Sequence, residues 1–560
     1  MTGFQESISR IHCKRRSFQD LTRDEFALLL ADTIMEKGLF SSPNWNWRYG
    51  GIRYVPRPLP PVDPGKILVL QWPGSLGDVC MAAPFLSVLR QRYPGAEISF
   101  LSSRAAQEVF SGSQDIDVVV PNPLDTYLDR MLSGQEIPPE DLLKDISGLA
   151  SRLIAEKYDL AVNLQVLPMS AALARLSGTR ETVGMTLSED GMPVIYGNIW
   201  SPYLFGVSAN LMRPLNPLHR TEIFRLMVDE KQDFTPRPTV HIPTDAVHRV
   251  QDFLDRQGIR DHERLVGLNP MSGTPIRQWP HFDRLAGMLR DNLGARVMIF
   301  GSKAEDQEVE AIVSRAGKGI IKATHFIFQE LMAAISGCDL FITNDTGPMH
   351  LACLMGRKVI ALFGPTDFRE VGPWQGEFHV FQSSGCRNCF RQKCTRPAEY
   401  CMNRITARDV YALAESELKG GVYLHLNRDT SHYPERESAH PDRLKWHAGH
   451  ILLEVFRERA RGTEEGDGDP VRGRLSREDL SRQCGQLKAV VESAIRSFSN
   501  QCNGEGANAF LKPLIMMNDL EFLDKRTPLG QDLEASLGYY RGLHRDLDAL
   551  IGLMRENRVD

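Results

Sequence analysis

The stretch that decides the fold is residues 66–101, KILVLQWPGSLGDVCMAAPFLSVLRQRYPGAEISFL. KILVLQ is a short apolar run typical of a buried strand, and PGSLGD is a turn. The apolar-faced segment that follows predicts a helix ending at Pro94-Gly95, and EISFLSS predicts the next strand. A strand, a crossover helix and another strand in this order indicate a parallel sheet covered by helices.

The same alternation continues through DVVVP and LAVNLQ and restarts near Arg264 with RLVGLNP. Further strand patterns (ARVMIFGS, LFITND, KVIALFG) then alternate with helical patterns as far as the segment GPMHLACLMG and beyond. The predicted fold class is therefore α/β, with two Rossmann-like domains facing a cleft. Such halves place a ligand at the carboxyl ends of their strands.

Four segments are expected along the chain. They are an N-terminal appendage with a Pro-rich linker (1–62), a first Rossmann-like domain (63–245), a second one (246–415) and a helical extension (416–560). The segment TPRPTVHIPTDAV resembles a linker between the two α/β domains.

The composition excludes several classes. A net charge of -5 over 560 residues does not favour nucleic-acid binding. The N-terminus has no apolar core of the signal-peptide type, and no apolar run approaches the roughly 18 residues of a membrane span. We therefore expect a cytoplasmic protein with reduced cysteines.

The segment NDTGPMHLA joins a strand end to a helix start and contains Asp345, Thr346, Gly347 and His350. Backbone N–H groups and the partial positive charge at such a helix start form an anion site. Gly347 permits close backbone approach, and Thr346 can donate a hydroxyl hydrogen bond to a phosphate. The alternative is that Asp345 or Thr346 only caps the helix while His350 is a packed side chain.

Two more strand ends carry polar groups. In NPMSGTPIRQWP, Ser272 and Thr274 offer donors, and Arg277 offers a bidentate fork for a phosphate, unless it is only a surface arginine. In IFGSKAEDQE, Glu305 is either a ribose ligand or an ordinary acid of a first helical turn.

Asp78, in PGSLGDVCMAAP, lies at the start of the first helix of the first half. It is either a helix cap or a general base that takes a proton from an attacking hydroxyl. The helix start stabilises the carboxylate, so such a base works best when proton transfer is late.

Taken together and in this order, these motifs resemble glycosyltransferase family 9, the ADP-heptose:lipopolysaccharide heptosyltransferases. The resemblance covers roughly residues 65–410. It implies a GT-B architecture and an inverting, metal-independent transfer of heptose from an ADP-sugar to a hydroxyl of a growing lipopolysaccharide core. It also implies a lipid-linked glycan acceptor and hence a peripheral location at the inner face of the inner membrane.

The resemblance assigns roles by position. Asp78 matches the proposed base, Arg277 and Ser272 the diphosphate loop, and Glu305 the ribose ligand. The remaining donor-site matches are Asp345, Thr346, Gly347 and His350. The added N-terminal and C-terminal segments leave other acceptors open, namely a protein or another surface glycan, and a sugar other than heptose. A third hypothesis is a non-catalytic GT-B scaffold.

Four cysteines are crowded together in the sequence CRNCFRQKCTRPAEYC: Cys386, Cys389, Cys394 and Cys401. Four thiolates at this spacing could bind zinc or iron in a structural role, and no cofactor is expected for catalysis. The alternative is a set of reduced thiols among basic residues, which could face anionic lipid headgroups.

Overall fold

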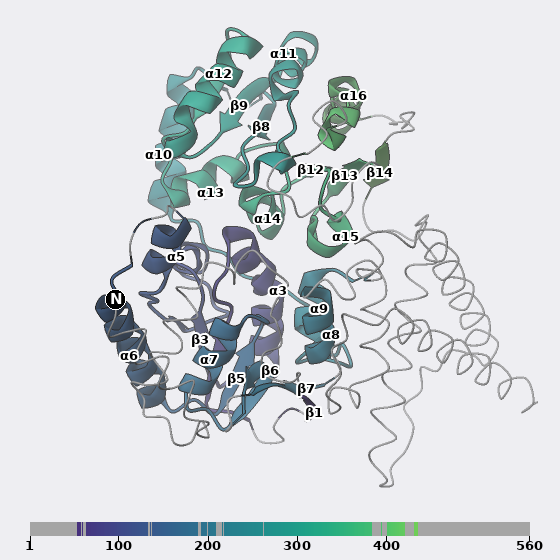
Figure 1. Ribbon diagram of the computed structural model, residues 1–560. Coiled ribbons are helices and arrows are strands. Elements are labelled where there is room, and N and C mark those ends of the chain that lie inside the picture. The colour runs from purple at the N-terminus through teal and green to yellow at the C-terminus, as the bar shows by residue number, and fades with distance from the viewer. Residues whose placement is uncertain are drawn as a thin grey trace, which may run out of the picture.

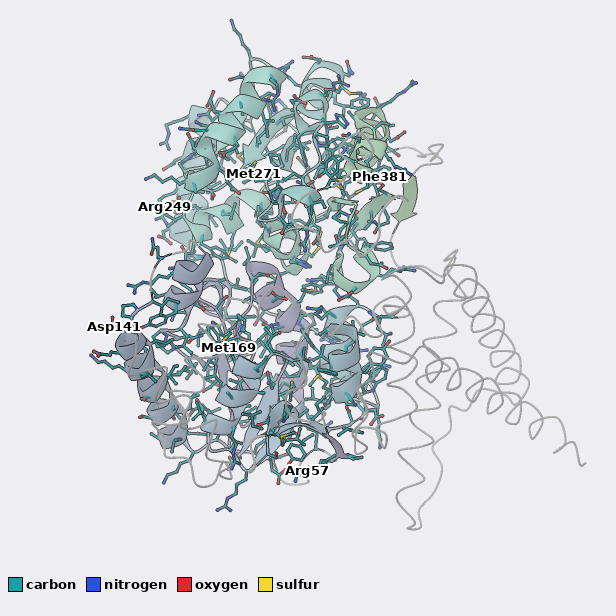
Figure 2. All side chains as sticks on the ribbon, in the orientation of Figure 1. Arg57, Asp141, Met169, Arg249, Met271 and Phe381 are labelled. Atoms are coloured by element: carbon teal, nitrogen blue, oxygen red, sulfur yellow. The ribbon has the colours of Figure 1, made fainter. Side chains whose placement is uncertain are left out.

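The computed structural model describes residues 53–434, except 58, 60–62, 133–134, 136, 189–191, 199, 209–215, 217, 261, 384–393, 395–399 and 421–429. These residues form two α/β halves, each built on a seven-stranded sheet. Figure 1 shows the halves one above the other, with helices on both faces of each sheet. Figure 2 shows side chains filling the space between sheets and helices in both halves.

The first half contains these elements in chain order: β1 (Arg53–Pro56), β2 (Lys66–Leu70), α3 (Leu76–Arg92), β3 (Glu97–Leu101), α4 (Ala105–Val109), β4 (Val118–Val119), α5 (Asp125–Leu132), α6 (Pro139–Glu156), β5 (Leu160–Asn163), α7 (Pro168–Leu176), β6 (Glu181–Leu187), β7 (Pro193–Gly197), α8 (Trp200–Ser208) and α9 (Arg220–Leu226). Its strand order is β1-β7-β6-β5-β2-β3-β4. All neighbouring strands are parallel except β6 and β7.

The second half contains α10 (Thr244–Arg256), β8 (Leu265–Asn269), α11 (Phe282–Leu293), β9 (Arg296–Phe300), α12 (Asp306–Ala316), β10 (Ile320–Ala323), α13 (Phe328–Ser336), β11 (Leu340–Asn344), α14 (Gly347–Leu354), β12 (Val359–Phe363), α15 (Phe368–Val371), β13 (Phe378–Ser383), α16 (Ala407–Lys419) and β14 (Thr430–Pro434). Its order is β10-β9-β8-β11-β12-β13-β14, parallel except for the last pair. The central strands β8, β11 and β12 are buried along their whole length, as expected for a parallel sheet covered on both faces.

Each sheet has a point at which the strand order reverses. In the first half β2 pairs with both β3 and β5, and in the second half β8 pairs with both β9 and β11. Ligands of open α/β sheets bind outside the carboxyl ends of strands at this point. The loop after β2 leads to Asp78, and the loops after β8 and β11 carry Arg277 and Asp345.

The predicted α/β alternation is confirmed, but the expected segment borders differ from the structure at both ends. Residues 53–56, assigned to the appendage, form the edge strand β1 and pair in parallel with β7. The border expected at 415 falls inside α16, and β14 extends the second sheet beyond it. The appendage before residue 53 and the extension after residue 434 lie outside the described residues.

The segment expected to link the halves packs against the first half before α10 begins at Thr244. The backbone N–H of Thr239 donates to Asp115 Oδ2 at 2.7 Å, and its hydroxyl donates to the same oxygen at 2.9 Å. The backbone N–H of Arg237 donates to Ser87 Oγ at 2.8 Å. These contacts could not be predicted from the sequence, because they join residues more than a hundred positions apart.

Candidate active site

The starts of α3 and α14, one helix from each half, meet where the two halves are in contact. A Cβ placed on Gly77 would lie 2.8 Å from His350 Cδ2, and one on Gly347 would lie 2.9 Å from Leu76 Cβ. Only residues without a side chain allow this approach, because real Cβ atoms essentially never come so close. The positive ends of two helix dipoles therefore converge on one place.

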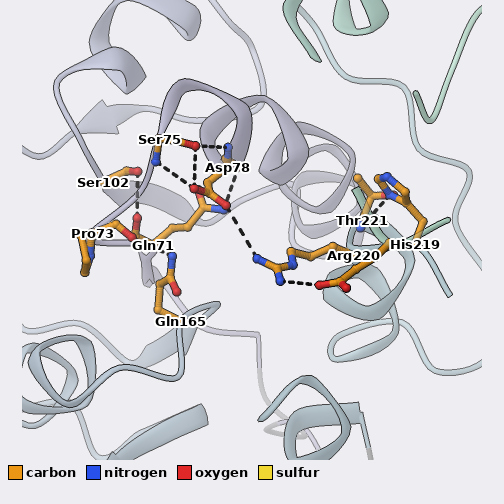
Figure 3. A network of polar contacts seen from close by, with 10 residues as sticks. Gln71, Pro73, Ser75, Asp78, Ser102, Gln165, His219, Arg220 and Thr221 are labelled. Atoms are coloured by element: carbon orange, nitrogen blue, oxygen red, sulfur yellow. Dashed lines mark hydrogen bonds and ion pairs between the residues drawn. The ribbon is translucent and has the colours of Figure 1, made fainter. Parts of the chain in front are cut away.

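Asp78 is the third residue of α3 and forms a capping box with Ser75, which is the N-cap. Its Oδ2 accepts from the backbone N–H of Ser75 at 2.8 Å and from the Ser75 hydroxyl at 2.7 Å. Figure 3 shows these bonds on one side of the carboxylate and Arg220 on the other. Asp78 therefore takes part in the capping of α3 as the N3 residue of the capping box, but the N-cap position expected for it is occupied by Ser75.

Arg220, the first residue of α9, approaches Asp78 from the side opposite Ser75. Its Nη1 lies 3.8 Å from Asp78 Oδ1, and its Nη2 lies 2.8 Å from Glu370 Oε1 on α15 of the second half. Neither Arg220 nor Glu370 was predicted from the sequence. The only local signal is the capping-box spacing of His219 and Glu222, which predicts a helix start and no role in a site.

Arg277 lies opposite, on the second half, where a short 3₁₀ turn (Pro275–Arg277) follows β8. Its Nη1 lies 3.1 Å from Asp345 Oδ2, and the same oxygen accepts from the Thr366 hydroxyl at 2.8 Å. The Asp345 side chain is 5% exposed and that of Arg277 is 36% exposed. Arg277 therefore has donors left for a further anion.

Two buried asparagines join the loops after β8 and β11. Asn344 accepts from the backbone N–H of Trp279 at 3.0 Å and donates to the Pro270 carbonyl at 2.7 Å. Asn269 donates to the hydroxyls of Thr343 and Thr346 at 3.2 and 3.1 Å. This bracing fixes the position of Arg277 relative to the start of α14.

The structure tests the capping interpretation of the α14 start. Thr346 occupies the N-cap but its side chain makes no capping bond. Asp345 is engaged by Arg277 and Thr366 instead. The simple capping role considered for these two residues is therefore wrong, because neither side chain caps the first-turn N–H groups of α14 within the described part of the chain.

His350 lies in the second turn of α14 and is 3% exposed. Burial lowers its pKa; Asp345 and Asp78 act to raise it, and Arg277 and Arg220 to lower it. These four charged groups place His350 between the two halves of the site. Its Nδ1 is buried and has no hydrogen-bond partner among the described residues.

Ser272, Thr274 and Glu305 stabilise loops around the site. The backbone N–H of Thr274 donates to Ser272 Oγ at 3.3 Å. Glu305 Oε2 accepts from the backbone N–H and hydroxyl of Ser302 at 2.7 and 2.8 Å, which is the arrangement of Asp78 with Ser75 in the other half. Each carboxylate thus holds a turn after a strand with one oxygen.

The segment after the cysteine cluster supports the loop that carries Arg277. The Tyr400 hydroxyl lies 2.9 Å from the Ile276 carbonyl oxygen and 2.7 Å from that of Gln278. A cavity of about 640 Å³ beside this loop is lined by Trp279, Phe282, Ile312, Cys394, Tyr400 and others. Asp78, Arg220 and His350 do not line it, so it is separate from the meeting point of the helices.

Two of the four clustered cysteines, Cys386 and Cys389, lie outside the described residues. Cys401 is buried, and a Cβ on Gly364 would lie 3.0 Å from its sulfur. Within the described part of the chain, no group of three or more histidine, cysteine or acidic side chains could hold a metal ion. Metal binding by the four cysteines stays a prediction.

The chain was compared with known proteins. The family model described as "Glycosyltransferase family 9 (heptosyltransferase)" matches residues 146–398. Lipooligosaccharide heptosyltransferase 2 of Haemophilus influenzae is 30% identical over 325 residues, 52% of this chain and 82% of that protein. Lipopolysaccharide heptosyltransferase 3 of Escherichia coli K12 is 26% identical over 355 residues, 61% of this chain and 95% of that protein.

A crystal structure of a glycosyl transferase family 9 protein from Veillonella parvula has the same fold, with a TM-score of 0.53 and 24% identity. The match covers 64% of this chain and 98% of that one. These findings define a two-domain glycosyltransferase. The chain belongs to glycosyltransferase family 9, the heptosyltransferase family of lipopolysaccharide core biosynthesis.

Proposed function

We propose that the protein transfers a heptose from an ADP-activated donor to a hydroxyl of a lipopolysaccharide core acceptor, with inversion and without a metal ion. The observation that carries the proposal is the meeting of the two helix starts. It brings Leu76 and Gly77, the residues directly before Asp78, against Gly347 and His350 of α14 in the other half. A base and an anion site thereby face each other across the cleft.

The second half holds the donor in this proposal. The N–H groups at the α14 start and the guanidinium of Arg277 bind the diphosphate, and Glu305 binds the ribose. A guanidinium has five N–H donors, so Arg277 can contact a phosphate while one nitrogen keeps Asp345. These positive groups stabilise the charge that builds up on the departing diphosphate, as a metal ion does in other enzymes.

The first half supplies the base. The acceptor oxygen attacks the anomeric carbon from the face opposite the diphosphate, the bond to the diphosphate oxygen breaks, and ADP leaves. Asp78 takes the proton of the attacking hydroxyl on Oδ1, because its Oδ2 is already held by Ser75. In this proposal the proton moves to Asp78 late, when the attacking oxygen has become acidic.

The location of the acceptor follows from the same proposal. No helix among the described residues is long and apolar enough to cross a bilayer. We propose that the protein acts as a peripheral protein at the cytoplasmic face of the inner membrane, because the proposed acceptor is a lipid-linked core.

The test is incubation of the full chain with ADP-heptose and either core lipid or protein acceptors, read by mass spectrometry, with and without EDTA. We expect heptose on the core lipid and an Asp78→Asn rate lower by about 10²- to 10⁴-fold. Asp245→Asn is the matched control, since Asp245 is also a first-turn helix acid but is 68% exposed on α10. Full activity of Asp78→Asn would refute the role of Asp78 as the base. Transfer only to protein would refute the lipopolysaccharide core as the acceptor.

A further inference from the structure

Arg220 connects the proposed base to the opposite half of the molecule. Its two terminal nitrogens face two carboxylates, Asp78 Oδ1 at 3.8 Å and Glu370 Oε1 at 2.8 Å. The Arg220 side chain is 17% exposed, and the Glu370 side chain is 6% exposed. The closer and more deeply buried contact is therefore the one that crosses the cleft.

A second bond between the halves fixes the backbone beside Arg220. His219 Nδ1 accepts from the backbone N–H of Thr221 at 3.2 Å, so the ring proton lies on Nε2. Nε2 then donates to the Gly372 carbonyl at 3.0 Å. Gly372 directly follows α15, the helix that carries Glu370, and Figure 1 shows α15 directly above α9. The start of α9 is thus attached to the second half twice.

The consequence concerns the orientation of Asp78. Ser75 holds one carboxylate oxygen from within the first half alone. The other oxygen faces Arg220 at a distance too long for a direct hydrogen bond, which leaves room for an acceptor hydroxyl to approach. Because Glu370 holds Arg220 in place, the charge beside the proposed base depends on contact between the halves.

We propose that Arg220 is a positioning residue for Asp78, and that Glu370 holds it so that the base is correctly set only when the two halves are closed. The inference rests on the proposed function, because it acts through Asp78. Its use is specificity: when the halves separate, Arg220 loses its contact with Glu370, and the base is no longer correctly set for the acceptor or for water.

The test compares kcat, KM and ADP affinity in Glu370→Gln, Arg220→Gln and Arg220→Lys. We expect Glu370→Gln and Arg220→Gln to lower kcat by about 5- to 100-fold, because a small misplacement of a catalytic group has effects of this size. ADP affinity is expected to change less than about twofold, since the proposed phosphate ligands are untouched. Arg220→Lys keeps the charge but loses the fork, so we expect partial recovery of kcat.

The link predicts strong coupling between these sites. Adding Glu370→Gln to the Arg220→Gln variant should lower kcat little further. Adding either substitution to Asp78→Asn should leave its residual rate unchanged. The matched control is Glu108→Gln, which removes the charge from a different contact between the halves, the hydrogen bond that Gln329 donates to Glu108, and is expected to keep the wild-type kcat. Circular dichroism verifies that each variant is folded, and Glu370→Asp replaces Glu370→Gln if the latter is not.

The possible outcomes distinguish failure of the proposed base from failure of the link through Arg220 and Glu370. Full activity in Asp78→Asn would refute the base and this inference together. A slow Asp78→Asn enzyme beside a wild-type kcat in Glu370→Gln and Arg220→Gln would overturn the link alone. An equal loss of kcat in Glu108→Gln and Glu370→Gln would also overturn it, because closure in general and not Arg220 would then be limiting.

Discussion

Replacing Gly347 with alanine tests whether close approach of α3 and α14 controls the cleft. The new Cβ would lie 2.9 Å from the Cβ and Cδ2 of Leu76 and 3.0 Å from its Cγ. Leu76 Cβ is attached to the backbone at the start of α3, so rotation of the side chain cannot remove this clash. The strain exists only while the halves are closed, and the simplest relief is a small separation of them.

The magnitude follows from the cost of adding a methyl group to a well-packed contact, about 1–3 kcal/mol. At 1.4 kcal/mol per factor of ten, the closed form loses about 5- to 150-fold in population relative to the open form. We expect kcat/KM for transfer to fall by a similar factor. The melting temperature should fall by less than about 2 °C, because each half can keep its own packing.

Three measurements check the reasoning: transferase kinetics, calorimetric melting and small-angle scattering with ADP present, where Gly347→Ala should have the larger radius of gyration. Gly148→Ala is the matched control, since a Cβ there meets nothing within 4 Å. In the interior of α6 it should leave activity unchanged and add about 0.5–1 kcal/mol of stability.

A Gly347→Ala enzyme with unchanged turnover and a melting temperature several degrees lower would refute this account. The strain would then be absorbed inside one half instead of between the two. Unchanged values of every quantity would also refute it, because the approach of α3 and α14 would then not control closure.

The remaining predictions concern the second half. Arg277→Ala should weaken ADP binding by about 10- to 150-fold in calorimetry, which corresponds to the loss of one hydrogen bond to a charged group. The ADP affinity of Arg277→Lys should lie between those of the wild type and Arg277→Ala. Burial lowers the pKa of His350 below 6.5, so the unfolded chain binds more protons and the free energy of unfolding falls as the pH drops below about 6.5. His350→Gln should reduce this loss in urea melts at pH 7 and 5. Tyr400→Phe should cost about 1 kcal/mol of stability and weaken ADP binding several-fold.

Each of these has a contrary outcome. Wild-type ADP affinity in Arg277→Ala would remove the diphosphate role. An unchanged pH dependence in His350→Gln would place the acid sensitivity elsewhere, for example at His281, whose pKa is also lowered by burial. Tyr411→Phe is the control for Tyr400, because its hydroxyl bonds Glu415 on the same helix; an equal effect in both would exclude specific support of the Arg277 loop.

Much of the fold was predictable from the sequence, because buried parallel strands and amphipathic helices leave local patterns. The antiparallel pair β6–β7 and the edge strands β1 and β14 were not predicted. Their short segments carry weak periodicity, and their stability comes from neighbours distant in the chain. The expected borders at 62 and 415 differ from the structure for this reason.

In the candidate site, too, some residues were predicted from the sequence and others were not. Asp78, Arg277 and Asp345 were found because each follows a strand, where a parallel sheet collects its ligands. Arg220 and Glu370 were missed, because their 2.8 Å contact joins residues 150 positions apart and no local pattern marks either one.

The sequence by itself determined the two α/β halves and the strand ends that carry polar residues, since backbone periodicity and turn chemistry act over a few residues. The tertiary structure alone decided that α3 and α14 meet at Gly77 and Gly347, and that Asp345 pairs with Arg277 instead of capping its helix. It also decided that the proposed base is linked to the other half through Arg220. These are matters of distance between separate elements, and packing of the whole chain sets them.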